Sequence, residues 1–252
     1  SEKPASYSSN LVFAGLVVLE PGFSRYLEKV GKSVRGELEF TQALNDAASQ
    51  EHVTVAEIGE DEWADLTYPW DVLKIHRRLM QEMKTDVKGK IEAGATVSGP
   101  VSIGSGSLVK AGSYIEGPVW IGCNTTVGPN SYIRPYTAIE DDCRIGNACE
   151  IKGSVIYSRT HVAHLSYVGD SVICEDVNMG AGTVVANLRF DEKPVKVRVN
   201  GVSTDSGMVK LGCFMGPGAK TGVNVSINPG VRICKDARIP PGTVVSRDVL
   251  NP

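Results

Sequence analysis

Histidines and cysteines are the residues of this sequence whose side chains could most readily do chemistry. The six cysteines are scattered without CxxC spacing, which argues against a zinc site or a disulfide scaffold, so we expect reduced thiols. Two of the four histidines, His52 and His76, lie early in the chain, and His161 and His164 stand together. Two histidines are a poor zinc set, but one imidazole can act as a general base near neutral pH. His164 is therefore a candidate base, although most histidines are ordinary surface or satisfied residues.

The element that must position these side chains is an internal repeat of six residues. Helices and strands repeat every 3.6 and 2 residues, so a period of six describes a short strand plus a turn. Three such units make one triangular coil, in which aliphatic side chains point inward and Gly and Asn form the corners. The sequence therefore predicts a mainly β protein, a left-handed parallel β-helix of hexapeptide repeats. The unbroken aliphatic series is Ile91, Val97, Ile103, Val109, Ile115, Ile121, Val127, Ile133, Ile139, Ile145 and Ile151.

The period is interrupted twice. After Ile151 the register slips, which indicates a bulge or outward loop, and His164 follows where a side chain can leave the stack. From about 187 to 210 the period vanishes in a polar, charged segment, which predicts a projecting arm. A β-helix also leaves flat faces, which favours side-by-side association, commonly with three-fold symmetry. Between the interruptions the period runs through Val162, Val168, Ile173, Met179 and Val185, and it returns at Met215, Thr221, Ile227, Ile233, Ile239 and Val245.

Residues 1–83 have α/β patterning instead. The segments LVFAGLVVL and HVTVAEI predict strands, and GELEFTQALNDAAS and the segment that begins at Pro69 predict helices. At about thirty residues for each βα pair, this is too little chain for a complete doubly wound domain. We therefore expect half of an α/β domain in residues 1–83 and the β-helix in residues 84–252.

The composition excludes several classes of protein. A chain of 252 residues, 42% hydrophobic and with a net charge of −3, can bury a core, so disorder is not expected. The sequence shows neither a membrane-length apolar run nor a signal peptide, so we expect a cytoplasmic protein without a membrane partner. It shows no basic block either, which argues against a nucleic-acid partner.

The first segment resembles the second half of sugar-1-phosphate nucleotidylyltransferases. The likeness rests on Glu2-Lys3-Pro4, on SNLVFAG at 9–15 and on WADLTYPWD at 63–71. It implies that Asp65 helps to hold a catalytic Mg²⁺ in an intact nucleotidylyltransferase site. The glycine-rich nucleotide loop of that family does not occur in this sequence, and without it nothing cradles a triphosphate. We therefore expect a fragment of a longer bifunctional protein, of which only the full-length form is a nucleotidylyltransferase.

The β-helix resembles the amino-sugar-1-phosphate acetyltransferase half of such bifunctional proteins, in their archaeal form. The motifs are AHLSYVGD at 163–170, VNMGAG at 177–182 and ANL at 186–188. The bacterial family has an aromatic hydroxyl where this chain has Leu188, which leaves glucosamine and galactosamine both open as acceptor sugars. The resemblance implies a general base at His164 held by Glu150, phosphate contacts from Arg134 and Lys152, sugar contacts from Tyr167 and Asn178, Asn187 beside the reacting amine, and Lys193 reaching the phosphate in a neighbouring subunit.

Acetyl-CoA is the implied co-substrate, and it lies in the groove between adjacent helices of a homotrimer. Ala181 matches one contact, and the next falls near either Gly216 or Gly222 because this chain has an additional hexad there. The predicted reaction is acetyl transfer from acetyl-CoA to the amine of glucosamine 1-phosphate or galactosamine 1-phosphate, in UDP-N-acetyl amino sugar biosynthesis. The alternatives are a non-catalytic β-helix that serves oligomerisation and regulation of a nucleotidylyltransferase, an O-acetyltransferase, and a γ-carbonic anhydrase-like metal enzyme.

Overall fold

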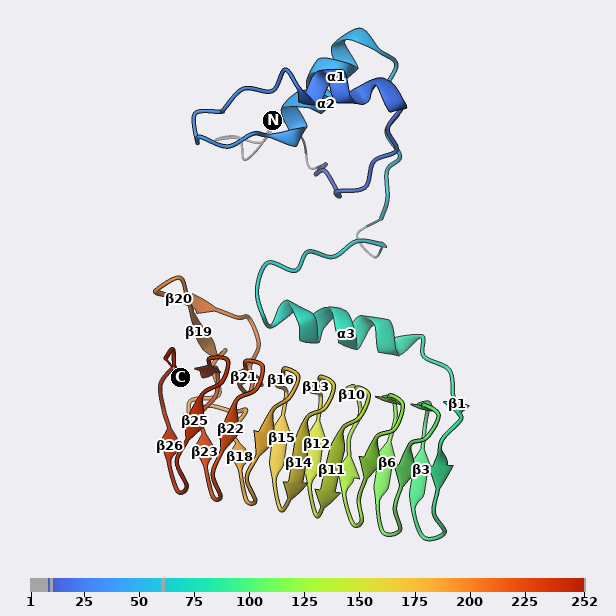
Figure 1. Cartoon of the computed structure of the whole chain (residues 1–252), viewed down its shortest axis with the longest axis vertical. Helices are drawn as coiled ribbons and strands as arrows, with labels where there is room; N and C mark the ends of the chain where they lie inside the picture. Colours follow the sequence, from blue (N-terminus) through green and yellow to red (C-terminus); the bar gives the residue numbers. More distant parts are fainter. Residues whose placement is uncertain (1–8, 10, 60–61, 252) are drawn as a thin grey trace. The chain divides into compact units, whose positions relative to one another are not determined.

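The computed structural model describes residues 9, 11–59 and 62–251 (Figure 1). The segment Glu2-Lys3-Pro4 and Asn10, which carried part of the first resemblance, lie outside the described residues. The chain divides into two compact units, Ser1–Ala64 and Asp65–Pro252.

The first unit has a small helical core. The helix predicted from GELEFTQALNDAAS forms as α2 (Phe40–Gln50), which packs its Ala43 and Ala47 against η1 (Pro21–Phe23) and α1 (Ser24–Leu27). The two predicted strands are wrong, because residues 11–19 and 52–58 form no strand. A strand needs a neighbour to pair its N–H and C=O groups, and the described part of this unit offers none, so apolar side chains such as Leu16 and Val18 remain exposed.

The second unit is a parallel β-helix with three eight-stranded sheets, as the six-residue period predicts. Sheet 1 contains β1 (Asp86–Val87), β4 (Val101–Ile103), β7 (Val119–Ile121), β10 (Thr137–Ile139), β13 (Val155–Ile156), β16 (Val172–Ile173), β21 (Phe214–Met215) and β24 (Arg232–Ile233). Sheet 2 contains β2 (Lys90–Ile91), β5 (Leu108–Val109), β8 (Thr126–Val127), β11 (Arg144–Asn147), β14 (His161–His164), β17 (Asn178–Met179), β22 (Lys220–Thr221) and β25 (Arg238–Ile239). Sheet 3 contains β3 (Thr96–Ser98), β6 (Tyr114–Glu116), β9 (Tyr132–Ile133), β12 (Glu150–Lys152), β15 (Tyr167–Gly169), β18 (Val184–Val185), β23 (Ser226–Ile227) and β26 (Val244–Val245).

The core is a stack of aliphatic side chains along the axis of the β-helix. In sheet 1, Ile121 pairs in register with Ile103 on one side and with Ile139 on the other, and all three are completely buried. Burial of each such side chain stabilises the fold by about 1.5–3 kcal/mol. The stack therefore fixes the register of every coil, and with it the positions of the outward-facing side chains.

The first interruption of the period is a shortened coil, so the predicted bulge or outward loop after Ile151 is wrong. Ile151 pairs with Ile133 below it and with Val168 above it, and Val168 is one residue closer in the chain. The corner after β12 is shorter by that residue, and Gly153 turns it with a φ of 55°. Ile156, which a strict six-residue period skips, is completely buried in the stack.

The chain leaves the coil between β18 and β21 to form an arm. The arm contains an antiparallel pair, β19 (Lys196–Val199) and β20 (Val202–Asp205), and the Leu211 N–H closes its base by donating to the Asn187 carbonyl at 2.9 Å (Figure 1). Apolar residues of the arm and of the start of helix α3 (Asp71–Gln81) cover part of sheet 1, so this helix packs on the β-helix. The buried residues of this cluster are Trp70, Leu73, Val155, Val172, Val195, Val197, Leu211 and Phe214. Among the described residues, no helix has the length and apolar character of a membrane span.

Candidate active site

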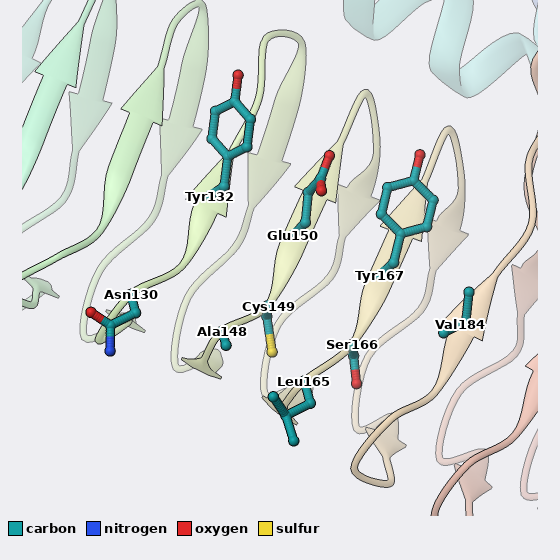
Figure 2. Close-up of a pocket in the computed structure, with 9 residues that line it drawn as sticks. All are labelled: Asn130, Tyr132, Ala148, Cys149, Glu150, Leu165, Ser166, Tyr167 and Val184. Atoms are coloured by element: carbon teal, nitrogen blue, oxygen red, sulfur yellow. The ribbon is translucent and has the colours of Figure 1, made fainter.

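An open pocket of about 380 Å³ lies on the outer face of sheet 3 (Figure 2). Tyr132, Glu150 and Tyr167 occupy equivalent positions in three adjacent strands and stand in one row, with their polar ends on the same side. These strands, β9, β12 and β15, lie in the middle of their sheet, away from both ends of the β-helix. The lining residues are Asn130, Tyr132, Ala148, Cys149, Glu150, Leu165, Ser166, Tyr167 and Val184.

Arg134 provides a fixed cation beside this row. Its Nη1 donates to Glu150 Oε1 at 2.9 Å, and its guanidinium carbon lies 5.6 Å from the ring centroid of Tyr132, whose hydroxyl hydrogen-bonds Glu116. The hydrogen bond to Glu150 raises the pKa of Arg134, so the guanidinium stays charged. Its Nε is buried without a hydrogen-bond partner among the described residues, whereas the side chain as a whole is 37% exposed, so the guanidinium is partly accessible to an anion.

Lys152 lies in the same sheet, one coil further along, and its charge is also paired. Its Nζ donates to Asp170 Oδ2 at 2.9 Å, and the Asn187 amide nitrogen donates to the same oxygen at 2.6 Å. That amide also lies 3.1 Å from the hydroxyl of Tyr167. Burial, followed by the negative charge of Asp170, raises the pKa of Tyr167, so its phenol remains a neutral hydrogen-bonding group.

His164 lies at the corner between sheets 2 and 3, directly before Leu165 of the pocket lining. Its side chain is exposed, and no described residue hydrogen-bonds its imidazole. Glu150, which the resemblance places behind this imidazole, is engaged by Arg134 instead. The structure therefore places His164 and Glu150 at neighbouring parts of the site without a hydrogen bond between them.

Ala181 continues the column of corner residues that contains His164. The Gly182 N–H donates to the His164 carbonyl at 3.1 Å, and the Asn224 N–H donates to the Ala181 carbonyl at 2.8 Å. Ala181 is therefore one coil above His164, and Gly222 lies in the next coil at the same corner. Gly216 follows β21 at the corner between sheets 1 and 2, so only Gly222 shares a corner with Ala181.

Asn178 and Lys193, two other predicted residues, lie outside this arrangement in the single chain. Asn178 stands on the outer face of sheet 2, in register with His161 and Lys220. Lys193 is exposed on the arm, and its backbone N–H donates to Asp191 Oδ1 at 3.4 Å.

Asp65, the predicted Mg²⁺ ligand, is exposed and accepts a hydrogen bond from the Thr67 hydroxyl. Within the part of the chain that the structure describes, no three or more His, Cys, Asp or Glu side chains gather in a group that could hold a metal ion. A single carboxylate does not make the oxygen-rich set that Mg²⁺ requires.

Sequence reasoning missed two contributors to the site, Tyr132 and Asp170. Tyr132 lies two residues before Arg134 and faces outward, so its position in the repeat was the available signal. Asp170 closes the motif AHLSYVGD, but its contacts come from Lys152 and Asn187, both distant in the chain. Only the stacking of coils reveals those contacts.

Comparison with known proteins finds longer relatives of this chain. Over 249 residues the chain is 47% identical to a bifunctional sugar-1-phosphate nucleotidylyltransferase/acetyltransferase of Sulfurisphaera tokodaii, covering 98% of this chain and 62% of that protein. It is 43% identical over 248 residues to the bifunctional protein GlmU of Methanocaldococcus jannaschii, covering 98% of this chain and 60% of that protein. The similarity to these bifunctional proteins extends over nearly the whole of this chain. It spans about three fifths of their length.

Two further similarities concern parts of the chain. Residues 115–209 match the family described as the GMPPB C-terminal domain. Among solved structures, a putative acetyltransferase of Bacillus cereus matches with a TM-score of 0.30 and 18% identity, covering 64% of this chain and 72% of the other.

Proposed function

We propose that this chain transfers the acetyl group of acetyl-CoA to the amine of an amino-sugar 1-phosphate, either glucosamine 1-phosphate or galactosamine 1-phosphate. The observation that carries the proposal is the row of cation, hydroxyl and amide groups beside the exposed His164. Arg134 offers a charged and partly exposed guanidinium to a phosphate, and Tyr167 and Asn187 offer hydrogen bonds to a sugar. The acetyltransferase named in the bifunctional relatives supports the same reaction.

In the proposed reaction His164 acts as the general base. Its imidazole takes a proton from the sugar amine while the nitrogen attacks the thioester carbonyl, so that a C–N bond forms and the C–S bond breaks. The proton then passes to the sulfur of the departing CoA, which leaves as a thiol. Ala181 and Gly222, above His164 at the same corner, are the proposed contacts of acetyl-CoA. Of the two alternatives, Gly216 and Gly222, only Gly222 shares that corner.

Glu150 has two proposed partners that it cannot hold at once. In the unliganded chain its carboxylate pairs with Arg134 at 2.9 Å. A bound phosphate competes for the same guanidinium and repels the carboxylate, which favours a turn of Glu150 toward the His164 corner. Phosphate binding would then help to orient the base.

The charges of the pocket support a homotrimer with shared active sites. Arg134 and Lys152 are each neutralised by a carboxylate of the same chain, so a dianionic sugar phosphate needs a further cation. Lys193 on the arm of a neighbouring chain is the proposed source. Phe190, on the same arm, is fully exposed, as expected for an apolar side chain that contacts another copy.

The full-length protein is proposed to be a sugar-1-phosphate nucleotidylyltransferase as well, with Mg²⁺ at that second site. The bifunctional names of the longer relatives support this. A second candidate function for the β-helix is non-catalytic oligomerisation and regulation of a nucleotidylyltransferase. The match of residues 115–209 to the GMPPB C-terminal domain is the observation in its favour.

An acetyl-transfer assay separates the two candidates. Release of CoA thiol is followed with glucosamine 1-phosphate, galactosamine 1-phosphate and unphosphorylated glucosamine as acceptors. We expect thiol release with at least one sugar phosphate and far less with glucosamine, since Arg134 and Lys152 would have no phosphate to bind. Thiol release no faster than spontaneous hydrolysis with all three acceptors would favour the non-catalytic candidate.

A further inference from the structure

Asp170 is a buried carboxylate directly after strand β15, whose Tyr167 lines the pocket. It follows β15 at a corner between sheets 3 and 1, with a φ of 48°, a conformation that Asp and Asn adopt more readily than most residues. Its N–H donates to the Lys152 carbonyl at 2.7 Å, and its carbonyl accepts from the Gly212 N–H at 2.8 Å. Only 6% of its side chain is exposed. A charge this buried must be paired to be tolerated.

One oxygen of this carboxylate joins two parts of the proposed acceptor site. Oδ2 accepts from Lys152 Nζ at 2.9 Å and from Asn187 Nδ2 at 2.6 Å. Lys152 belongs to the proposed phosphate end of the acceptor, and Asn187 to its amine end. Asp170 therefore connects the two ends within the protein, although neither proposed role includes it.

Two glycines, Gly153 and Gly169, leave space around this carboxylate. A Cβ atom on Gly153 would lie 2.7 Å from Asp170 Oδ1, and one on Gly169 would clash with the Tyr167 hydroxyl and lie 2.7 Å from Asn187 Nδ2. Real Cβ atoms essentially never approach other atoms so closely. Two glycines thus make room for the Asp170, Asn187 and Tyr167 side chains to meet.

We propose that Asp170 is a positioning residue for the acetyl acceptor, which holds the Lys152 ammonium and the Asn187 amide at a fixed separation. This rests on the proposed function, because the acceptor roles of Lys152 and Asn187 belong to it. Asp170 itself touches neither substrate. Its negative charge also opposes phosphate binding at Lys152, so it restrains affinity for phosphate while it orders the amine end.

Asp170→Asn tests the proposal because it removes the charge with almost no change of shape. We expect inorganic phosphate to bind about threefold tighter or more by calorimetry, since a nearby negative charge is lost. We expect kcat for acetyl transfer to fall about tenfold or more, since the hydrogen bond that positions Asn187 loses its charged acceptor. A merely structural defect would weaken phosphate binding and catalysis together, so tighter phosphate binding with slower turnover is the distinguishing result.

Asp176→Asn is the matched control. Asp176 also has a positive φ, of 60°, and also pairs with a cation, Arg159 at 2.8 Å, but it is exposed at a different corner. Its variant should leave both measurements unchanged. Phosphate binding that weakens or stays the same in Asp170→Asn, or a kcat that is unaltered, would overturn the proposal, as would equal effects in the control.

A third measurement keeps the proposal testable if the chain proves not to transfer acetyl groups. The side-chain amide resonance of Asn187 should move in Asp170→Asn and remain in place in Asp176→Asn. Should Asp170→Asn fail to fold, Lys152→Met breaks the same link from the other side and should also move that resonance. An Asn187 resonance that is the same in all folded variants would refute the positioning role, whatever the activity of the chain.

Discussion

Replacement of His164 by alanine should separate catalysis from stability. The imidazole is exposed and has no hydrogen-bond partner among the described residues, so its removal should change the free energy of unfolding by less than about 0.5 kcal/mol. Loss of a general base lowers the rate by about 10² to 10⁴. At about 1.4 kcal/mol for each tenfold change, this corresponds to about 3–5 kcal/mol of transition-state stabilisation. The variant should therefore fold normally and turn over at least a hundredfold more slowly.

The assay is thiol release at saturating acetyl-CoA and amino-sugar phosphate, with thermal unfolding measured on the same samples. His161→Ala is the control, because His161 is exposed on the same strand, β14, but faces outward from sheet 2 beside Asn178. Its variant should keep most of the wild-type kcat. If His164→Ala retained most of its activity, or if both variants lost it equally, the assignment of the base would be refuted.

Three further predictions follow from the core, the thiols and the arm. Ile156→Ala should lower the free energy of unfolding by about 2–5 kcal/mol in denaturant titrations, whereas Val244→Ala, at a position 66% exposed, should lower it by less than about 1 kcal/mol. Burial raises the pKa of the Cys143 thiol from about 9 to about 11. The contribution of Cys143 to the free energy of unfolding is therefore complete below pH 9 and is lost as the pH rises to 11. Wild type should lose more stability between pH 9 and pH 11 than Cys143→Ala, as measured by denaturant titration at each pH. Mixtures of inactive His164→Ala and Lys193→Ala chains, refolded together, should regain part of the activity if neighbouring subunits share a site, and a monomer by light scattering would contradict this.

The repeat could be predicted from the sequence because every coil imposes the same requirement on its inward position. A fixed period does not detect a corner that is one residue shorter, however. Ile156 was therefore not predicted as a core residue, and the break after Ile151 was interpreted as a bulge or an outward loop. The strands predicted in residues 11–19 and 52–58 failed for a different reason. Apolar β-branched residues favour an extended backbone, but pairing with a neighbouring strand decides whether a strand forms.

The pairing of charges in the site could not be predicted from the sequence. Arg134 and Glu150 meet because one coil separates them, and the sequence motifs indicated phosphate and histidine as their partners instead. Asp170 meets Lys152 and Asn187 for the same reason. Such contacts depend on the length of each coil and on the rotamer that each long side chain adopts, and a local sequence motif determines neither of these.

The central position of the site in sheet 3 has a consequence for how the protein loses activity. In a solenoid each coil contacts only its neighbours, so stability behaves approximately like that of a one-dimensional array, and opening begins at the ends. The site strands β9, β12 and β15 have other strands of sheet 3 on both sides. Fraying of the first or last coil therefore leaves the site intact. The geometry of the site should persist until the central coils of the β-helix unfold.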